Sequence, residues 1–253
     1  MKTVNIRTIA VGAGIPRVLV SVACPTAEEI VARGHELAPM AFDIAEWRVD
    51  HYDGARNPAS VLDTLARLRD ALGDKPLLFT FRTAKEGGMR SIAPEAYIEL
   101  NIAAAESGCA DAVDVEILAG DGAVRRCIDG VHRAGAVVIG SHHTFEDTPS
   151  KEELLTRLRK MRDMGADILK LAVMPHSRTD VLTLLCAADE MSRETDCPLA
   201  VMSLAPLGAV TRVCGEAFGS ALTFAAVGQP SAPGQLPLEQ LNTALKILHE
   251  AGR

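Results

Sequence analysis

The chain has 253 residues, of which 48% are hydrophobic, and a formal net charge of −7 at pH 7. This length is enough for one large core, and no Pro-, Gly- or Ser-rich stretch resembles a linker, so we expect residues 1–253 to form a single domain. The acidic balance, without a Lys/Arg cluster, excludes the usual surface of nucleic-acid-binding proteins and favours a small-molecule substrate.

Residues 3–16 come first, and we expect them to form a β-hairpin across the bottom of a barrel. From about residue 18 onward, apolar runs typical of strands alternate with amphipathic helical segments, separated by short turns. The predicted strands are residues 18–24, 42–48, 77–82, 111–117, 136–142, 166–173, 198–204 and 221–227. Helical segments between and after them include residues 26–38, 58–72, 94–107, 151–165 and 237–253. Eight strand–helix units predict an α/β protein with the (β/α)8 TIM-barrel fold.

A doubly wound parallel sheet is the main alternative fold. Such sheets usually carry a Gly-rich phosphate loop after the first strand, whereas here the first predicted strand ends in Cys24, Pro25 and Thr26. The barrel is therefore the preferred interpretation.

Neither a membrane segment nor a metal site is indicated by the sequence. No apolar run is long enough to span a bilayer. The six cysteines are scattered without Cys-x-x-Cys pairs, which argues against a zinc site or a disulfide framework and favours a reducing, cytoplasmic location. We expect most of these cysteines to be small core residues.

Lys170 lies in the middle of ADILKLAV, an apolar run at residues 166–173 between Gly165 and Pro175. Burial disfavours an ammonium group and lowers its pKa, which leaves a neutral amine able to attack a carbonyl and form a Schiff base. The alternative is a structural lysine whose head group reaches water at the strand end.

Side chains of successive strand residues alternate between the barrel interior and the helices, and active sites of such barrels lie at the carboxyl ends of the strands. This alternation directs charged groups of four strands into one interior: Glu46 and Arg48, Arg82, His143, and Lys170. A structural Glu46–Arg48 ion pair and a core role for His143 are the competing interpretations. His142 has the opposite direction, so the two histidines make a poor metal site. Asp114 and Glu116 share a face and are interpreted as polar support.

Five segments together resemble type I 3-dehydroquinate dehydratase. They are EWRVD at 46–50, FTFRTAKEGG at 79–88, SHHTFEDTP at 141–149, ILKLAV at 168–173 and GSALTFAAVGQPSAPGQ at 219–235. Their order, spacing and position in the predicted barrel agree, and the resemblance extends over essentially the whole chain.

The resemblance implies elimination of water from 3-dehydroquinate, giving 3-dehydroshikimate, in the shikimate pathway of aromatic amino acid biosynthesis. Lys170 would form the Schiff base, His143 would transfer protons, and Glu86 would orient His143. Arg212, Ser231 and Gln235 would hold the substrate carboxylate. Glu46, Arg48 and Arg82 would hold the ring hydroxyls, and Met202 would pack against the ring. No metal or organic cofactor is implied, and the family is commonly homodimeric.

One stretch departs from the family pattern. Before the arginine the family usually has Ser-Met-Gly, two residues, Gly, two residues and Ser-Arg. This chain instead has Ser203, Leu204 and Ala205, followed by Gly208 and by Thr211 next to the arginine. Because the supporting turn differs, we expect a small displacement of the loop that carries the carboxylate contact.

Two other functions fit parts of the pattern. A class I aldolase-like barrel would also use an iminium lysine, but GQPSAPGQ at 228–235 lacks the character expected of a phosphate loop. A catalytically silent barrel that only binds a carboxylated metabolite is the second alternative. The joint presence of Lys170, His143 and Glu86 argues against it.

Overall fold

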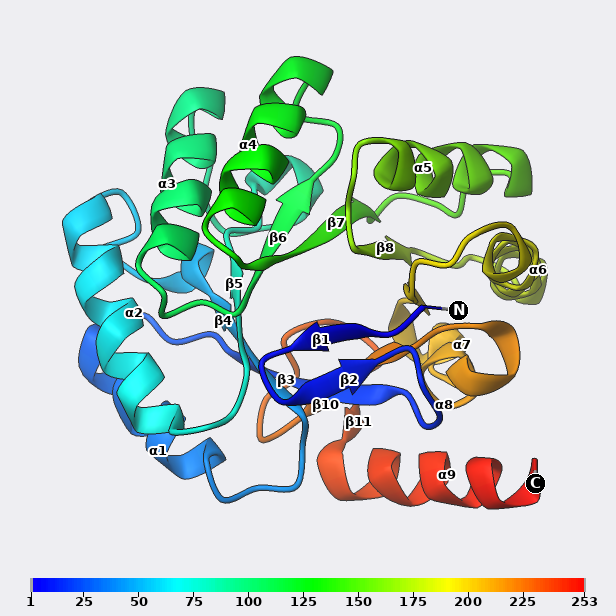
Figure 1. Ribbon diagram of the computed structural model, residues 1–253. Helices are drawn as coiled ribbons and strands as arrows, with labels where there is room; N and C mark the ends of the chain where they lie inside the picture. Colours follow the sequence, from blue (N-terminus) through cyan, green and yellow to red (C-terminus); the bar gives the residue numbers. More distant parts are fainter. Residues whose placement is uncertain (1, 253) are drawn as a thin grey trace.

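Eight parallel strands form a barrel in the computed structural model, which describes residues 2–252 (Figure 1). They are β3 (Arg17–Val22), β4 (Ile44–Arg48), β5 (Leu77–Thr80), β6 (Ala112–Glu116), β7 (Val137–Thr144), β8 (Ile168–Val173), β9 (Leu199–Ser203) and β10 (Leu222–Ala226). β10 pairs with β3 along four residues, and a bridge between Leu199 and Ser220 links β9 to the start of β10. A two-residue strand, β11 (Leu236–Pro237), extends β10. The predicted α/β barrel is confirmed.

Helices surround the barrel and follow the strands in sequence (Figure 1). They are α1 (Ala27–Leu37), α2 (Pro58–Leu72), α3 (Pro94–Glu106), α4 (Asp121–Arg133), α5 (Lys151–Asp163), α6 (Arg178–Glu194), α7 (Ala205–Gly208), α8 (Val210–Val213) and α9 (Leu238–Ala251). Local sequence sets where several begin. Thr26 and Glu29 form a capping box at α1, Asn57 caps α2, and Ser177 caps α6. Each cap satisfies amide groups that the first helical turn leaves unpaired.

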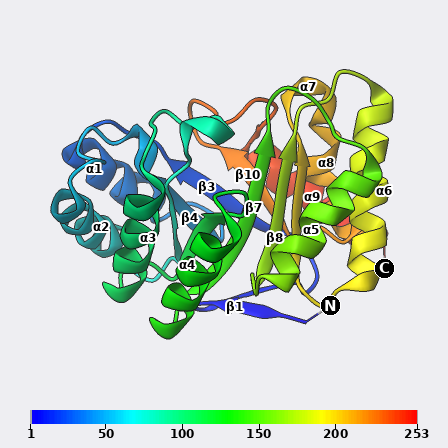
Figure 2. The ribbon, with the colours of Figure 1, turned by 90° about the horizontal axis from the view of Figure 1, so that it is seen from above.

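The N-terminal hairpin covers the amino end of the barrel. β1 (Val4–Ile6) and β2 (Ile9–Val11) pair antiparallel. Ile6 and Val11 are fully buried in a cluster with strand residues such as Leu19 and Ile44. Figure 2 shows β1 at one end of the barrel and α7 at the other. The hairpin therefore fills the end opposite the expected active site, as the sequence predicted.

Successive side chains of each barrel strand point alternately outward and inward, so the barrel has two separate hydrophobic cores. Outward residues such as Trp47 and Phe79 pack in the large cluster against the helices. Inward residues such as Ile44 and Leu78 form a smaller interior cluster with the hairpin. Above this apolar layer, the next inward positions are polar, and the predicted direction of each charged strand residue is confirmed.

Short 3-10 turns follow two strands and shape the loops at the carboxyl end. η1 (Val49–His51) follows β4, and η2 (Ala84–Glu86) lies shortly after β5. A third, η3 (Gly215–Phe218), lies between α8 and β10. The first two turns, η1 and η2, bring His51 and Glu86 to the cavity, which strand alternation alone does not predict.

Within residues 2–252, no helix combines the length and the apolar character needed to cross a membrane. All six cysteines are free thiols, as expected. Cys127 is buried in the core, and Cys24, Cys109 and Cys197 are half-buried and pack against it, so most of the cysteines do contact the core. Cys186 lies on an exposed face of α6.

Candidate active site

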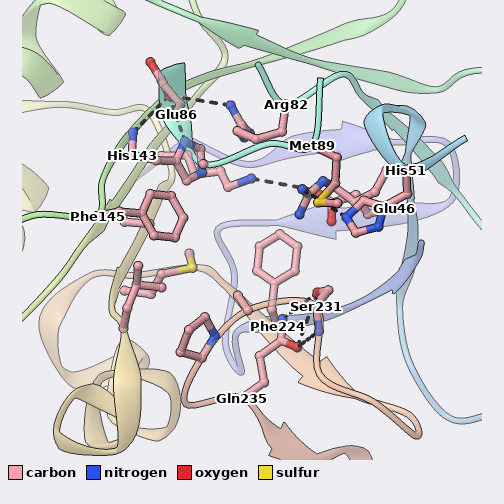
Figure 3. Close-up of a pocket in the computed structure, with 18 of the residues that line it drawn as sticks. Glu46, His51, Arg82, Glu86, Met89, His143, Phe145, Phe224, Ser231 and Gln235 are labelled. Carbon is pink, nitrogen blue, oxygen red and sulfur yellow. Dashed lines mark hydrogen bonds and ion pairs between the residues drawn. The ribbon is translucent and has the colours of Figure 1, made fainter. Parts of the chain in front are cut away.

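A cavity of about 250 Å³ opens at the carboxyl end of the barrel. All ten residues predicted for the site line it: Glu46, Arg48, Arg82, Glu86, His143, Lys170, Met202, Arg212, Ser231 and Gln235. Figure 3 shows side chains from several strands and loops pointing into this space. Its wall also includes His51, Met89, Phe145 and Phe224, which the sequence did not suggest.

Lys170 projects from the middle of β8 into the barrel and is only 4% exposed. Its Nζ donates a hydrogen bond to Asp114 Oδ2 at 2.9 Å and lies 3.7 Å from Glu46 Oε1. The Phe224 ring covers the amine, with its centroid 4.9 Å from Nζ. The amine is therefore held inside the barrel, and the interpretation of a lysine reaching water at the strand end was wrong.

Asp114 and Arg82 form the ionic support beneath this amine. Arg82 Nη2 lies 2.8 Å from Asp114 Oδ1, and Arg82 Nη1 lies 2.8 Å from Glu116 Oε1. Burial alone would raise the pKa of Asp114, but the charges of Arg82 and Lys170 hold that pKa well below its usual range. Asp114 thus stays ionised as a counter-ion for both cations.

His143 and Glu86 face each other at the carboxyl end of β7. Glu86 Oε2 accepts from His143 Nδ1 at 2.9 Å and from the His143 backbone N–H at 3.0 Å (Figure 3). Burial, followed by the charge of Arg82, lowers the pKa of His143 to about 3, despite the neighbouring carboxylate. The pKa of Glu86 falls to about 2 because hydrogen bonds from His142 and His143 outweigh its burial. The imidazole is therefore neutral near pH 7, with Nδ1–H donated to Glu86 and Nε2 available as a base.

Arg48 lines the cavity but does not pair with Glu46. Its Nε and Nη2 donate to the two carboxylate oxygens of Asp50 at 2.8 and 2.9 Å. Glu46 accepts instead from Ser21 Oγ at 2.6 Å and Thr80 Oγ1 at 3.1 Å. The alternative of a structural Glu46–Arg48 ion pair was wrong, because the turn η1 brings Asp50 back onto the guanidinium.

Arg212 on α8 is a buried cation with few partners. Its side chain is 1% exposed, Nη2 donates to the Pro233 carbonyl at 3.1 Å, and Nη1 lies 3.9 Å from Met202 Sδ. Nε has no hydrogen-bond partner among the described residues. Burial lowers the pKa of Arg212 to about 10. A buried guanidinium facing a cavity in this state is suited to an anionic ligand.

Ser231 and Gln235, in the loop after β10, line the same cavity as this cation, and Figure 3 shows the two side chains in contact with each other. Gln235 Nε2 donates to Ser231 Oγ at 3.0 Å, and the Ser231 backbone N–H donates to Gln235 Oε1 at 2.9 Å. Ser231 Oγ also donates to Ser21 Oγ at 3.0 Å. The loop is thus fixed to the first barrel strand by polar contacts that place both side chains at the cavity.

The sequence profile described as Type I 3-dehydroquinase matches residues 18–251. The chain belongs to this family. Proteins named 3-dehydroquinate dehydratase from Salmonella agona and Salmonella typhimurium are each 46% identical over 252 residues, which cover 99% of this chain and 100% of theirs.

Solved structures agree with this membership of the type I 3-dehydroquinase family. The type I 3-dehydroquinate dehydratase of Clostridium difficile, solved with covalent modified comenic acid, superposes with a TM-score of 0.96 at 40% identity. That match covers 99% of this chain and 100% of the other. The 3-dehydroquinate dehydratase of Geobacillus kaustophilus has a TM-score of 0.95 at 37% identity, covering 100% of this chain and 98% of the other.

Ala205 occupies the position where the type I 3-dehydroquinase pattern has glycine. Its φ is +57°, a left-handed conformation that costs a residue with a Cβ about 1–2 kcal/mol. The Ala205 N–H donates to the Pro233 carbonyl at 3.2 Å, which ties this turn to the loop that carries Ser231. Arg212 donates to the same Pro233 carbonyl, so the strained turn and the arginine share one contact, and the arginine still reaches the cavity.

The sequence indicated only part of the role of two residues of this type I 3-dehydroquinase. Asp114 was interpreted only as polar support, yet it is the hydrogen-bonded partner of Lys170. His142 does point outward as predicted, but its Nδ1 also binds Glu86 Oε1 at 3.0 Å. The inward direction of Asp114 was a usable signal. The contact of His142 was not predictable, because it depends on where the η2 turn places Glu86.

Proposed function

We propose that the protein is a 3-dehydroquinate dehydratase that works through a Schiff base on Lys170. The observation that carries this proposal is the placement of a buried lysine amine and a neutral, carboxylate-bound histidine in one cavity. An amine supplies the electrophilic catalysis and an imidazole supplies the proton transfer, which together are what elimination next to a ketone needs.

The reaction would begin at the C3 ketone of 3-dehydroquinate. The amine of Lys170, once it has lost its proton, adds to this carbon, and the resulting carbinolamine loses water to form an iminium ion. Asp114 and Glu46, next to Nζ, would stabilise the positive charge of that iminium electrostatically. The iminium acidifies the C2 proton because it can accept the electron pair released on deprotonation.

His143 would then carry the proton between two atoms of the substrate. Its Nε2 takes the C2 proton, and the electron pair moves into the iminium to give an enamine. The protonated imidazole, stabilised by Glu86, gives the proton to the C1 hydroxyl, which leaves as water while the enamine electrons form the C1–C2 double bond. Hydrolysis of the conjugated iminium releases 3-dehydroshikimate and restores Lys170. One imidazole serving both steps is consistent with loss of proton and hydroxyl from the same face.

The remaining cavity residues would orient the substrate. Arg212 would pair with the carboxylate, and the loop residues Ser231 and Gln235 would hydrogen-bond to it. Glu46, Arg48 and Arg82 would contact the ring hydroxyls, and Met202 would pack against the ring. Arg212 is assigned to the carboxylate because, of the three arginines that line the cavity, it is the one without a carboxylate partner within residues 2–252. Arg48 and Arg82 are both paired with aspartates.

The test is intact-mass analysis after incubation with 3-dehydroquinate and borohydride, which reduces an iminium to a stable amine. The wild type is expected to gain the mass of the ligand, and Lys170→Ala is expected to gain nothing. Lys75→Ala is the matched control, because Lys75 also lies over a phenylalanine ring, 4.3 Å from the Phe42 centroid, outside the cavity. Absence of an adduct on folded wild-type protein would refute the Schiff base.

Formation of the enone product, followed by ultraviolet absorbance, tests the elimination itself. His143→Ala is expected to form the borohydride-trapped adduct while eliminating water at least about 100-fold more slowly, the usual range for loss of a general acid–base group. Wild-type turnover by this variant would remove His143 from the mechanism.

We further propose that the protein acts in the cytoplasm as a homodimer in the shikimate pathway. The family membership supports these assignments. Growth of a dehydratase-deficient bacterial strain without aromatic amino acids, after introduction of this gene, tests the pathway. Sedimentation equilibrium tests the dimer, for which a mass close to the 26.9 kDa of one chain is the contrary result.

A further inference from the structure

The Glu86 carboxylate lies between two imidazoles that face different parts of the molecule. Its Oε2 binds the backbone and side chain of His143, on the side of the main cavity. Its Oε1 binds His142 Nδ1 at 3.0 Å, which is the one hydrogen bond that this oxygen receives from residues 2–252. His142 is 8% exposed and does not line the main cavity.

Glu86 needs a second anchor because of where it comes from. It ends the single 3-10 turn η2 rather than lying on a strand, and its long side chain must cross to β7 to reach the imidazoles. A carboxylate held at one oxygen can still rotate about its terminal bond. His142 fixes the other oxygen and so defines the plane in which Oε2 meets His143 Nδ1.

The surroundings of His142 set which ring nitrogen carries its proton. Glu86 is ionised and can only accept, so His142 Nδ1 must be the donor. Thr144 Oγ1 lies 3.5 Å from His142 Nε2 and accepts from Arg157 Nη1 at 2.9 Å, which leaves the hydroxyl hydrogen free to turn toward Nε2. Both neighbours of the ring are therefore compatible with a proton on Nδ1 that is donated to Glu86.

A second cavity of about 350 Å³ lies on the other side of Glu86 from the main one. His142 and Glu86 line it together with Thr83, Ser91, Tyr97 and Leu118. Leu118 is 51% exposed, so this space reaches the protein surface. The His142 ring and the Glu86 carboxylate can thus both be reached from an opening that does not pass through the substrate site.

We propose that His142 is a positioning residue, which fixes the Glu86 carboxylate so that Glu86 holds His143 in the orientation and tautomer needed for proton transfer. The inference rests on the proposed function, in which His143 performs the elimination. It assigns to His142 no contact with the substrate. Its loss should therefore lower kcat through His143 and leave substrate binding nearly unchanged.

Three substitutions separate this role from simple packing. His142→Asn keeps an N–H near the position of Nδ1, His142→Gln places one near Nε2 instead, and His142→Ala removes both. We expect Ala and Gln to lower kcat by about 10-fold to 100-fold, the usual cost of losing a hydrogen bond to a charged group. We expect Asn to retain most of the wild-type kcat, with KM changed little in all three. His132→Ala is the matched control, because His132 also binds a carboxylate, Asp167 at 2.9 Å, but far from either cavity.

Chemical rescue uses the second cavity. Added imidazole is expected to restore part of the kcat of His142→Ala without competing with 3-dehydroquinate, because it enters from the other side of Glu86. It is expected to leave His142→Gln unchanged, since glutamine fills the space. Wild-type kcat in His142→Ala, or equal losses in Asn and Ala, would overturn the proposal.

A measurement without substrate keeps this inference separate from the proposed function. The proton that His143 Nδ1 shares with Glu86 gives a downfield nuclear magnetic resonance signal. We expect the signal in the wild type and His142→Asn, and its loss or broadening in His142→Ala. An unchanged signal in all variants would overturn the positioning role. An inactive wild type with the expected signals would overturn only the proposed reaction.

Discussion

Replacing Arg212 with methionine should stabilise the free protein while damaging its activity. The guanidinium is 1% exposed and lacks a carboxylate partner within residues 2–252, and burial lowers its pKa from its ordinary value to about 10. At about 1.4 kcal/mol for each tenfold change in proton affinity, the charged side chain costs the folded state about 3 kcal/mol. Its hydrogen bond to the Pro233 carbonyl returns about 1–2 kcal/mol of this. The expected net gain for Arg212→Met is about 1–2 kcal/mol, or roughly 2–8 °C in Tm.

Thermal unfolding with and without quinate is the assay. Quinate keeps the carboxylate and ring hydroxyls of the proposed substrate but has no ketone, so it can bind without reacting. It should raise the Tm of the wild type by pairing with Arg212 and have little effect on Arg212→Met. The same variant should lose at least about 30-fold in kcat/KM, because removing one partner of a buried charge pair costs about 2–5 kcal/mol.

Arg82→Met is the matched contrast, since it makes the same change at a buried arginine that does have carboxylate partners. It removes the cation that pairs with Glu116 and leaves Asp114 with Lys170 alone, so it should destabilise by about 3–5 kcal/mol. Destabilisation of Arg212→Met by a similar amount, with quinate still raising its Tm, would refute the assignment of Arg212 to a ligand anion.

Three further predictions concern stability. Ala205→Gly should leave the free energy of unfolding unchanged or raise it by up to about 1 kcal/mol, as measured by chemical denaturation. The reason is that relief of the left-handed backbone strain at Ala205 exceeds the conformational entropy that glycine adds to the unfolded chain. A clear loss of stability would contradict the strain at φ +57°. Asp114→Asn should lower the free energy of unfolding by about 3–5 kcal/mol, because Lys170 and Arg82 lose a shared counter-ion, and denaturant titration against wild type measures it. The pKa of His143 is about 3 when folded and about 6.5 when unfolded, so below pH 6.5 the unfolded state binds a proton that the folded state does not. Stability should therefore fall as the pH drops from 6.5 toward 3, by up to about 1.4 kcal/mol per pH unit, and His143→Asn should show a shallower slope; parallel slopes would refute a neutral buried imidazole.

Strand alternation explains why so much of the site was predictable. In a parallel barrel the side-chain direction has a period of two, and buried strands tolerate few charges. An inward charged residue near a carboxyl strand end, such as Glu46 or Lys170, is therefore a strong signal. The structure places the ten predicted residues around one cavity for this reason.

The ion-pair partner of each charged side chain was less predictable than its direction. The partner depends on turns and on neighbouring strands, whereas the direction depends only on the two-residue alternation along the strand. Arg48 and Glu46 are two residues apart on one face, which suggested a pair, yet the η1 turn gives Arg48 a better-aligned partner in Asp50. Asp114 reaches Lys170 from β6, two strands away across the interior. Local sequence indicates that Asp114 points inward, but it does not indicate which partner Asp114 or Arg48 will have.

The arrangement of buried charge also dictates how a ligand must lie. Glu46 and Asp114 surround Lys170, so the ketone end of the cavity repels a carboxylate and favours a cationic iminium. Arg212 comes from α8, after β9, and has no protein carboxylate to neutralise it among the described residues. A ligand with a ketone and a carboxylate at different positions of one ring therefore has one favourable orientation. The free protein bears the cost of an unpaired guanidinium, and in the proposed complex the anion that relieves this cost would also place the ketone at Lys170.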